Sequence, residues 1–306
     1  MADAATRAPL PTPPSSSQPR SALALLLALR PHQWAKNLLV FLPPLFNHAW
    51  RNTAAWRSAL EAFIAISLCA SAIYLLNDLM DAPSDRLHPQ KSRRPIAAGA
   101  LKPSVAIAVA AVLFAASAAV AFAMPLAFAG YLAAYAALAL LYVFGAKRIA
   151  VLDIMILAAL YTVRILAGGA ATSIPVSAWL LAFSVFFFFS VALSKRCSEL
   201  TTWGDRASHR PYGSADYRTL SVAGMAGGYA AVVVFAQYVH SPDTASLYRH
   251  PDLLWLMCPI LLYWITRIWL LTNRGQMDED AVLFALKDLP SYAAGLLAGI
   301  VLLCAL

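Results

Sequence analysis

Apolar stretches long enough to cross a lipid bilayer recur along most of the chain, and they restrict the possible folds more than any other feature. Each stretch has about 18 to 20 residues, the length that an α-helix needs to span a hydrocarbon core of roughly 30 Å. Of the 306 residues, 61% are hydrophobic and 12% are charged, whereas a soluble domain carries about twice that charged fraction. The sequence therefore predicts an all-α polytopic membrane protein and excludes a soluble globular one.

Nine candidate spans follow from these stretches, which predicts a bundle of about nine transmembrane helices. We expect one domain over residues 21–306, preceded by an Ala/Pro/Ser-rich tail over residues 1–20 that is disordered. The short apolar segment that ends at Arg30 and Pro31 is expected to be an interfacial helix. The predicted spans lie near residues 34–50, 58–77, 104–123, 126–145, 151–172, 177–194, 219–240, 253–272 and 290–306.

The basic residues predict the orientation of the bundle. With the N-terminus in the cytoplasm, the N-terminal region and the loops after spans two, four, six and eight carry nineteen of the 23 Lys and Arg residues. This positive-inside asymmetry predicts a multi-pass protein of a bacterial-type inner membrane. The positive-inside distribution then accounts for most of the net charge of +8. Because no basic stripe with interleaved aromatic residues is present, we expect no nucleic-acid partner.

Acidic residues gather on the same predicted side, although topology does not require them there. In "NDLMDAPSD", Asp78, Asp81 and Asp85 stand at i, i+3 and i+7, which places them on one face if the helix continues. Pro83 is expected to kink or end the helix, which would place Asp85 in the following loop. Carboxylates this close repel one another. A Mg²⁺ ion, with Asn77 adding a neutral oxygen, would remove that repulsion, and Mg²⁺ is commonly shared with substrate phosphates.

Basic residues follow these acids within ten positions, at Lys91, Arg93 and Arg94. Acids alone would repel a phosphate, whereas acids together with bases predict a metal-bridged diphosphate site. The alternative is an ordinary solvated helix end. The acids near the C-terminus are expected to lie in a solvated loop, and they are Asp278, Glu279, Asp280 and Asp288.

The acidic motif resembles that of a known superfamily. "NDLMDAPSD" is similar to the Asn-Asp-x-x-Asp-x-x-x-Asp motif of the UbiA-type membrane transferases, which are bundles of nine helices with a site that opens toward one membrane face. Three further stretches, "RPHQWAKNLLVFLPPL", "DRLHPQKSRRPIAAG" and "VLDIMILAALYTVRILAGGA", resemble the polyprenyl-phosphate phosphoribosyltransferase branch, whose characterised members are decaprenyl-phosphate phosphoribosyltransferases. The resemblance covers residues 30–306.

This resemblance implies Mg²⁺-dependent transfer of 5-phosphoribose from phosphoribosyl diphosphate (PRPP) to a polyprenyl phosphate. The expected partners are these two substrates and membrane lipids, and homo-oligomerisation is left open. Asp78, Asp81 and Asp85, helped by Asn77, would hold Mg²⁺ against the diphosphate. The implied phosphate-binding residues are Lys36, Asn37, Lys91, Arg93, Arg94 and Lys147.

A basic stretch at the end of the sixth span separates this branch from the aromatic prenyltransferases of the superfamily, which carry a second Asp-rich motif there. Here "SKRCSEL" places Lys195, Arg196 and Glu199 at that position. Bases in place of acids favour a site for additional anionic groups, such as the 5-phosphate and the acceptor phosphate. The alternative is that Lys195 and Arg196 only anchor the span. Prenyl transfer from a prenyl diphosphate to an aromatic or other small acceptor is the first rival function.

Arg164 is the deepest of the predicted site residues. It follows Asp153 by eleven residues, or three turns, so both lie on almost the same helix face, with Arg164 roughly 16 Å deeper. A cation at this depth usually faces an internal cavity or a partner. We expect Asp153, Arg164, Tyr142 and Lys147 to line one wall of a cytoplasm-facing cavity, with pairing of Arg164 to an acid or backbone carbonyls as the alternative. A secondary transporter, the second rival, would place more ionisable residues near the midplane.

Overall fold

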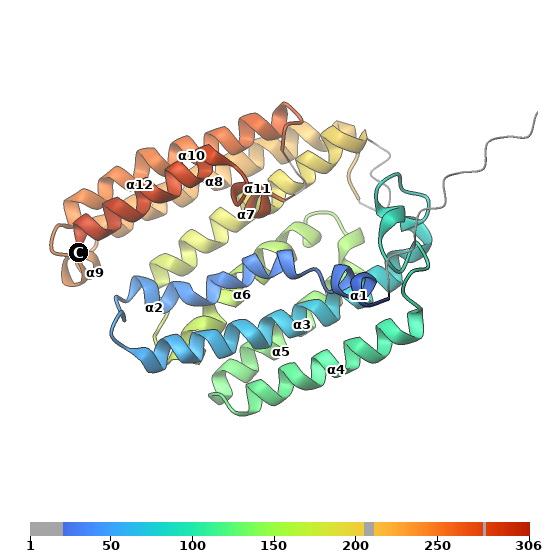
Figure 1. Cartoon of the computed structure of the whole chain (residues 1–306). Coiled ribbons are helices and arrows are strands. Elements are labelled where there is room, and N and C mark those ends of the chain that lie inside the picture. The colour runs from blue at the N-terminus through green and yellow to red at the C-terminus, as the bar shows by residue number, and fades with distance from the viewer. Residues whose placement is uncertain (1–20, 205–210, 278–279) are drawn as a thin grey trace, which may run out of the picture.

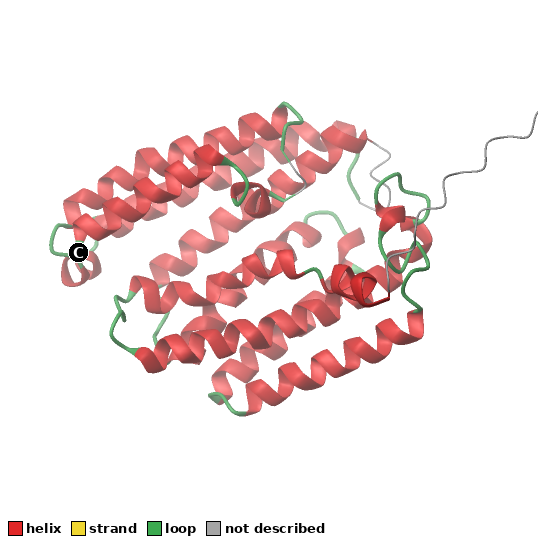
Figure 2. Cartoon of the chain, viewed as in Figure 1, coloured by secondary structure: helices red, strands yellow, loops and turns green. Residues whose placement is uncertain are grey.

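The computed structural model describes residues 21–204, 211–277 and 280–306, and this part of the chain folds into helices without any strand (Figure 2). The all-helical prediction is thus confirmed, while the predicted tail over residues 1–20 lies outside the described residues. Seven helical segments are long and apolar enough to cross a membrane. They are α3 (Thr53–Asp85), α4 (Pro103–Phe122), α5 (Leu126–Phe144), α6 (Leu152–Thr172), α7 (Ala178–Trp203), Ser214–Val239 with α8 (Tyr217–Val239), and Pro251–Asn273 with η6 (Pro251–Leu256) and α10 (Met257–Asn273).

Two shorter elements stand where the first and last predicted spans were expected. The last is α12 (Leu289–Ala305), and the first is a 3₁₀ helix, η1 (Pro31–Phe41), that continues into α2 (Leu42–Phe46). The two prolines of α2 lack the N–H groups that would extend a regular α-helix. The remaining short helices are α1 (Ser21–Leu29), η2 (Lys91–Arg93), η3 (Ala146–Arg148), η5 (Ser214–Asp216), α9 (Pro242–Leu247) and α11 (Ala281–Ala285).

Helix α3 extends further than predicted at its C-terminal end. Its N-terminus is capped by Asn52, whose side chain accepts a hydrogen bond from the backbone N–H of Ala55. The helix continues through Pro83 and ends at Asp85, and the N–H of Arg86 still bonds to the carbonyl of Ala82 at 3.2 Å. The prediction that Asp85 lies in the following loop is therefore wrong, because Pro83 falls in the last turn and breaks the hydrogen-bond ladder only locally.

The helices form two groups with α6 between them. Figure 1 shows α7, α8, α10 and α12 together on one side and α3, α4 and α5 on the other. Helix α6 packs against α3 and α5 as well as α7, and η1 lies on both α3 and α6. This arrangement surrounds α6 with protein, which allows it to carry polar side chains at a depth where lipid would not tolerate them.

Gly168 allows η1 to pack directly on α6. A Cβ atom at this position would lie 2.2 Å from the carbonyl oxygen of Val40 and 2.7 Å from its Cα. Membrane helices commonly use small residues for such close backbone approach. As a consequence Asn37, about one turn before Val40, meets Arg164, one turn before Gly168.

Candidate active site

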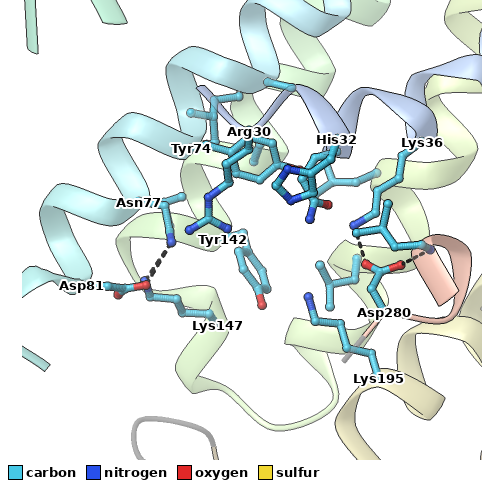
Figure 3. A pocket seen from close by; sticks show the side chains of 18 of the residues that line it. Arg30, His32, Lys36, Tyr74, Asn77, Asp81, Tyr142, Lys147, Lys195 and Asp280 are labelled. Carbon is cyan, nitrogen blue, oxygen red and sulfur yellow. Dashed lines mark hydrogen bonds and ion pairs between the residues drawn. The ribbon is translucent and has the colours of Figure 1, made fainter. Parts of the chain in front are cut away.

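A cavity of about 400 Å³ lies among η1, α3, α5, α6, α7 and the segment that contains α11. Figure 3 shows side chains entering it from opposite sides, with those of α3 facing those of η1 and α7. Most of the residues predicted from the sequence line this cavity. They are Lys36, Asn77, Asp81, Asp85, Lys91, Arg94, Tyr142, Lys147, Arg164, Lys195 and Glu199.

On the α3 side, Asn77, Asp81 and Lys147 bond to one another (Figure 3). The ammonium group of Lys147 donates to Asp81 Oδ1 at 2.6 Å and to Asn77 Oδ1 at 3.1 Å, and Asn77 Nδ2 donates to Asp81 Oδ2 at 3.0 Å. Lys147 is 5% exposed and stands on η3, the turn between α5 and α6. Asp81, one of the acids that line the cavity, therefore already has a cation beside it.

The two other acids of the motif are paired with arginines. Asp78 Oδ1 accepts from Arg30 at 2.7 Å and lies 3.3 Å from Arg94, which also donates to Asp85 at 2.6 Å. Asp78 is 1% exposed and does not line the cavity, and its second oxygen is buried with no hydrogen-bond partner in the part of the chain that is described. Arg30 was not among the predicted site residues. The mutual repulsion inferred from the sequence is thus relieved by cations of the chain itself.

The oxygen donors at this end of the cavity fit a Mg²⁺ ion shared with a phosphate ligand. Within the described ranges no three Asp, Glu, His or Cys side chains converge on one point, so an all-protein metal cage is not built there. Mg²⁺ commonly takes only one or two carboxylates and completes its shell with water and substrate phosphates. Asn77, Asp81 and Asp85 supply such oxygens, and the unpartnered Oδ2 atom of Asp78 lies on the same helix turn as Asp81.

On the opposite side, Lys36 forms a buried ion pair with Asp280. Asp280 also caps α11, since its Oδ1 accepts from the N–H groups of Val282 (3.1 Å) and Leu283 (3.4 Å). Burial alone would raise the pKa of the Asp280 carboxyl, but Lys36, Lys195 and the hydrogen bond from Leu283 together hold its pKa below the usual range. Figure 3 shows Lys195 of α7 extending into the cavity, with its ammonium group between Tyr142 and Asp280.

Asp280 is therefore a cavity residue that the sequence did not indicate. The expectation of a solvated loop is wrong for Asp280 and also for Asp288, which caps α12 and pairs with Arg267 at 2.6 Å. Asp278 and Glu279 lie outside the described residues. One local signal could have indicated Asp280, since an Asp immediately before a short apolar run, here "AVLFA", is typical of a helix N-cap.

At the inner end of the cavity lies Arg164, which is 5% exposed. Its Nε donates to Asn37 Oδ1 at 2.8 Å, Nη1 to the Leu160 carbonyl at 2.5 Å and Nη2 to the Tyr135 hydroxyl at 3.0 Å. Asn37 does not line the cavity, and its Nδ2 donates to Ser67 at 2.9 Å. Among the described residues no carboxylate forms an ion pair with Arg164. Of the expected alternative, pairing with an acid or with backbone carbonyls, this part of the chain shows the carbonyl contact, at Leu160.

Behind Tyr142 lies a buried network that also keeps two predicted residues away from the cavity. Arg196 donates to Asp153 at 2.7 Å, to Glu199, and to the Tyr142 hydroxyl at 2.6 Å. Asp153 accepts a second bond, at 2.6 Å, from Tyr212, and burial followed by this bond raises the pKa of Tyr212. The prediction that Asp153 lines the wall is wrong, because its carboxylate is fully buried within the network. Arg196 is also buried and does not line the cavity, and its binding of substrate stays a prediction.

The charges around the cavity are unbalanced in favour of cations. Of the described lining residues, eight are Lys or Arg and four are Asp or Glu. The predicted residue Arg93, on η2, is exposed and does not line the cavity. This excess favours a ligand with several negative charges. The eight are Arg30, Lys36, Lys91, Arg94, Lys147, Arg164, Lys195 and Lys287.

The fold and the cavity define the class of protein, a helical membrane bundle around a polar cavity that is rich in cations. The sequence matches the model of the UbiA prenyltransferase family over residues 38–289, and the chain belongs to this family. The family prediction is confirmed, and the protein is a membrane transferase of the UbiA superfamily.

Curated relatives cover most of the chain. An uncharacterized protein y4nM of Sinorhizobium fredii is 34% identical over 277 residues, which are 89% of this chain and 54% of that protein. The nodulation protein NoeC of Azorhizobium caulinodans is 36% identical over 286 residues, or 90% of this chain and 92% of NoeC. Decaprenyl-phosphate phosphoribosyltransferase of Mycolicibacterium smegmatis is 37% identical over 248 residues, or 76% of each chain. The chain thus spans about half of y4nM and most of the other two.

A solved structure shares the fold. The UbiA homolog from Archaeoglobus fulgidus, bound to GPP and Mg²⁺, superposes with a TM-score of 0.70 and covers 91% of this chain and 99% of its own. The sequence identity is 16%, so this similarity supports the architecture alone.

Proposed function

We propose that the protein transfers 5-phosphoribose from PRPP to a polyprenyl phosphate, in a Mg²⁺-dependent reaction that releases diphosphate. The excess of cations that line the cavity carries this proposal. PRPP brings a diphosphate and a phosphate, and the acceptor brings another phosphate, whereas a prenyl diphosphate with a neutral acceptor brings one diphosphate. The similarity to the mycobacterial decaprenyl-phosphate phosphoribosyltransferase supports the same substrates.

The donor diphosphate would bind at the α3 end of the cavity. Asn77, Asp81 and Asp85 would hold Mg²⁺, which when bound neutralises the charge that develops on the leaving diphosphate. Lys147 and Arg94 touch these carboxylates in the structure, so each needs only a small rotation to donate a charge-assisted hydrogen bond to a phosphate oxygen. The planar guanidinium of Arg94 suits two phosphate oxygens at once.

The acceptor phosphate would attack from the opposite side. Its oxygen forms a bond to C1 of the ribose while the bond from C1 to the diphosphate oxygen breaks, and the electron pair leaves with the diphosphate. A phosphate monoester is largely ionised at neutral pH, so the attack needs no strong general base. Lys36 and Lys195, which face the α3 acids across the cavity, would hold the acceptor phosphate or the 5-phosphate.

The orientation and location belong to the same proposal. The uneven distribution of Lys and Arg between the two sides supports a location in a bacterial-type inner membrane, with the N-terminus and the C-terminal end of α3 on the cytoplasmic side. PRPP would then enter from the cytoplasm, and the lipid acceptor would enter sideways between helices from the bilayer.

Radiolabel transfer in membranes tests the proposal. Membranes that contain the protein, supplied with Mg²⁺, PRPP labelled in the ribose and a polyprenyl phosphate, should form a labelled lipid. Asp81→Ala should abolish the product, whereas Asp252→Ala should not, because Asp252 is exposed on η6 and no residue of η6 lines the cavity. Formation of a prenylated aromatic acceptor from a prenyl diphosphate, with no labelled lipid, would refute the proposal and leave the family assignment intact.

A further inference from the structure

We propose that Arg164 forms an inner subsite for a phosphate monoester, and that Asn37 keeps this subsite cationic by giving Arg164 a neutral partner. The inference rests on the proposed function and adds the position of a second anion. Asn37 acts as a positioning residue here, since it touches Arg164 and does not line the cavity.

The guanidinium of Arg164 has hydrogen-bonding capacity left for a ligand. Arginine carries five N–H donors, and three of them bond to Asn37, the Leu160 carbonyl and Tyr135. One hydrogen on each terminal nitrogen therefore has no partner among the residues that the structure describes. Arg164 lines the cavity, so these two donors can reach an anion within it.

No observed partner neutralises the positive charge of Arg164, because Asn37, the Leu160 carbonyl and Tyr135 are all neutral. A carboxylate has the shape of the Asn37 carboxamide and would accept the same bond from Nε, and it would cancel the positive charge. The carboxamide instead accepts from Arg164 and donates to Ser67. An uncompensated cation at this depth is costly, and a bound anion offsets that cost.

The subsite is separated from the diphosphate site. Asn37 bonds to Ser67, and Asp81 lies fourteen residues further along α3, which is about 21 Å of helix rise. The guanidinium bonds to the carbonyl of Leu160, one turn back along α6 toward the end where Lys147 contacts Asp81, so the gap that a ligand must bridge is shorter than this helix rise. A phosphate held there would be a different group from the diphosphate bound at Asp81. It is either the 5-phosphate of the donor or the phosphate of the lipid acceptor.

Binding measurements on the full chain in detergent, with Mg²⁺, test the subsite. The probes are PRPP, a short-chain polyprenyl phosphate and inorganic pyrophosphate, and the variant is Asn37→Asp. We expect Kd for one of the two monoesters to rise about tenfold or more, as a charge-assisted bond is lost, while Kd for pyrophosphate stays within about twofold. The ligand that loses affinity identifies the phosphate. Asn52→Asp is the matched control, because it adds the same charge and preserves the α3 cap.

Unchanged Kd values for both monoesters in a folded Asn37→Asp variant would overturn the subsite. A wild-type protein that binds PRPP no more tightly than pyrophosphate would instead refute the proposed function. The subsite would then be tested only by the Kd for the polyprenyl phosphate in the wild type and in Asn37→Asp. Should Asn37→Asp fail to give a monodisperse protein with a normal melting transition, Arg164→Gln takes its place with the same expected pattern of Kd values.

Discussion

Replacement of Gly168 by alanine should loosen the Arg164 subsite without any change in its own residues. The added Cβ would lie 2.2 Å from the Val40 carbonyl oxygen, and an ordinary contact begins near 3.4 Å, so η1 must move by about 1 Å. The contacting atoms are backbone, which cannot rotate away. A shift of this size stretches the 2.8 Å bond between Arg164 and Asn37 beyond hydrogen-bonding distance. Overpacking of this kind costs about 1–3 kcal/mol.

The free energy of unfolding in mixed detergent and denaturant measures this cost, and the Kd for PRPP reports on the subsite. Gly130→Ala is the matched control, since Gly130 is exposed on α5 and a Cβ there meets nothing within 4 Å. It should leave stability unchanged or raise it by up to about 1 kcal/mol. Equal stability of the two variants, or a normal Kd in a destabilised Gly168→Ala, would refute the idea that this backbone contact positions Asn37.

Three further outcomes are expected. Lys36→Met leaves the buried Asp280 carboxylate unpaired and should reduce the free energy of unfolding by about 3 kcal/mol. The double variant Lys36→Met/Asp280→Asn should recover most of this loss. A double variant as unstable as the single one would speak against the ion pair. Because the pKa of Asp280 is lower in the folded protein, its stabilisation exists above the ordinary carboxyl pKa and disappears as pH falls through the folded value. The melting temperature of Asp280→Asn should therefore fall less steeply in acid than that of the wild type, and parallel curves would contradict this. Lys147→Met should lower kcat/KM for PRPP at least about tenfold. The control variant Arg148→Met changes an exposed neighbour and should have little effect. Similar losses in both variants would argue against the contact between Lys147 and Asp81.

Hydropathy predicted the lengths of most helices, but it failed where polar residues continue a helix. The predicted second span ends at residue 77, whereas α3 continues to Asp85. The additional turns are held by tertiary pairs, such as Arg30 with Asp78 and Lys147 with Asp81. Likewise, no periodicity in the sequence predicted that η1 would be a 3₁₀ helix, because this conformation accompanies its close packing on α6.

The site could be predicted where charge stands at helix ends, and it could not where distant segments meet. Asp81, Lys147 and Arg164 were identified from motif, position and depth. Asp280 was missed because its partner Lys36 lies 244 residues away along the chain, a separation that no local pattern reveals. Asp153 was misplaced, since helix periodicity gives the face of α6 but not which other segments fill the space in front of it.

The length of α3 has a consequence for how the two proposed reactants find each other. Its 33 residues make a rod of about 50 Å, some 20 Å more than the hydrocarbon thickness, and Asp78, Asp81 and Asp85 lie in its last eight residues. On the proposed function, the donor reaches this site by diffusion through water in three dimensions, while the acceptor arrives by diffusion within the plane of the bilayer. Turnover should then follow the mole fraction of acceptor in the membrane, and dilution with inert phospholipid at constant total acceptor should slow it.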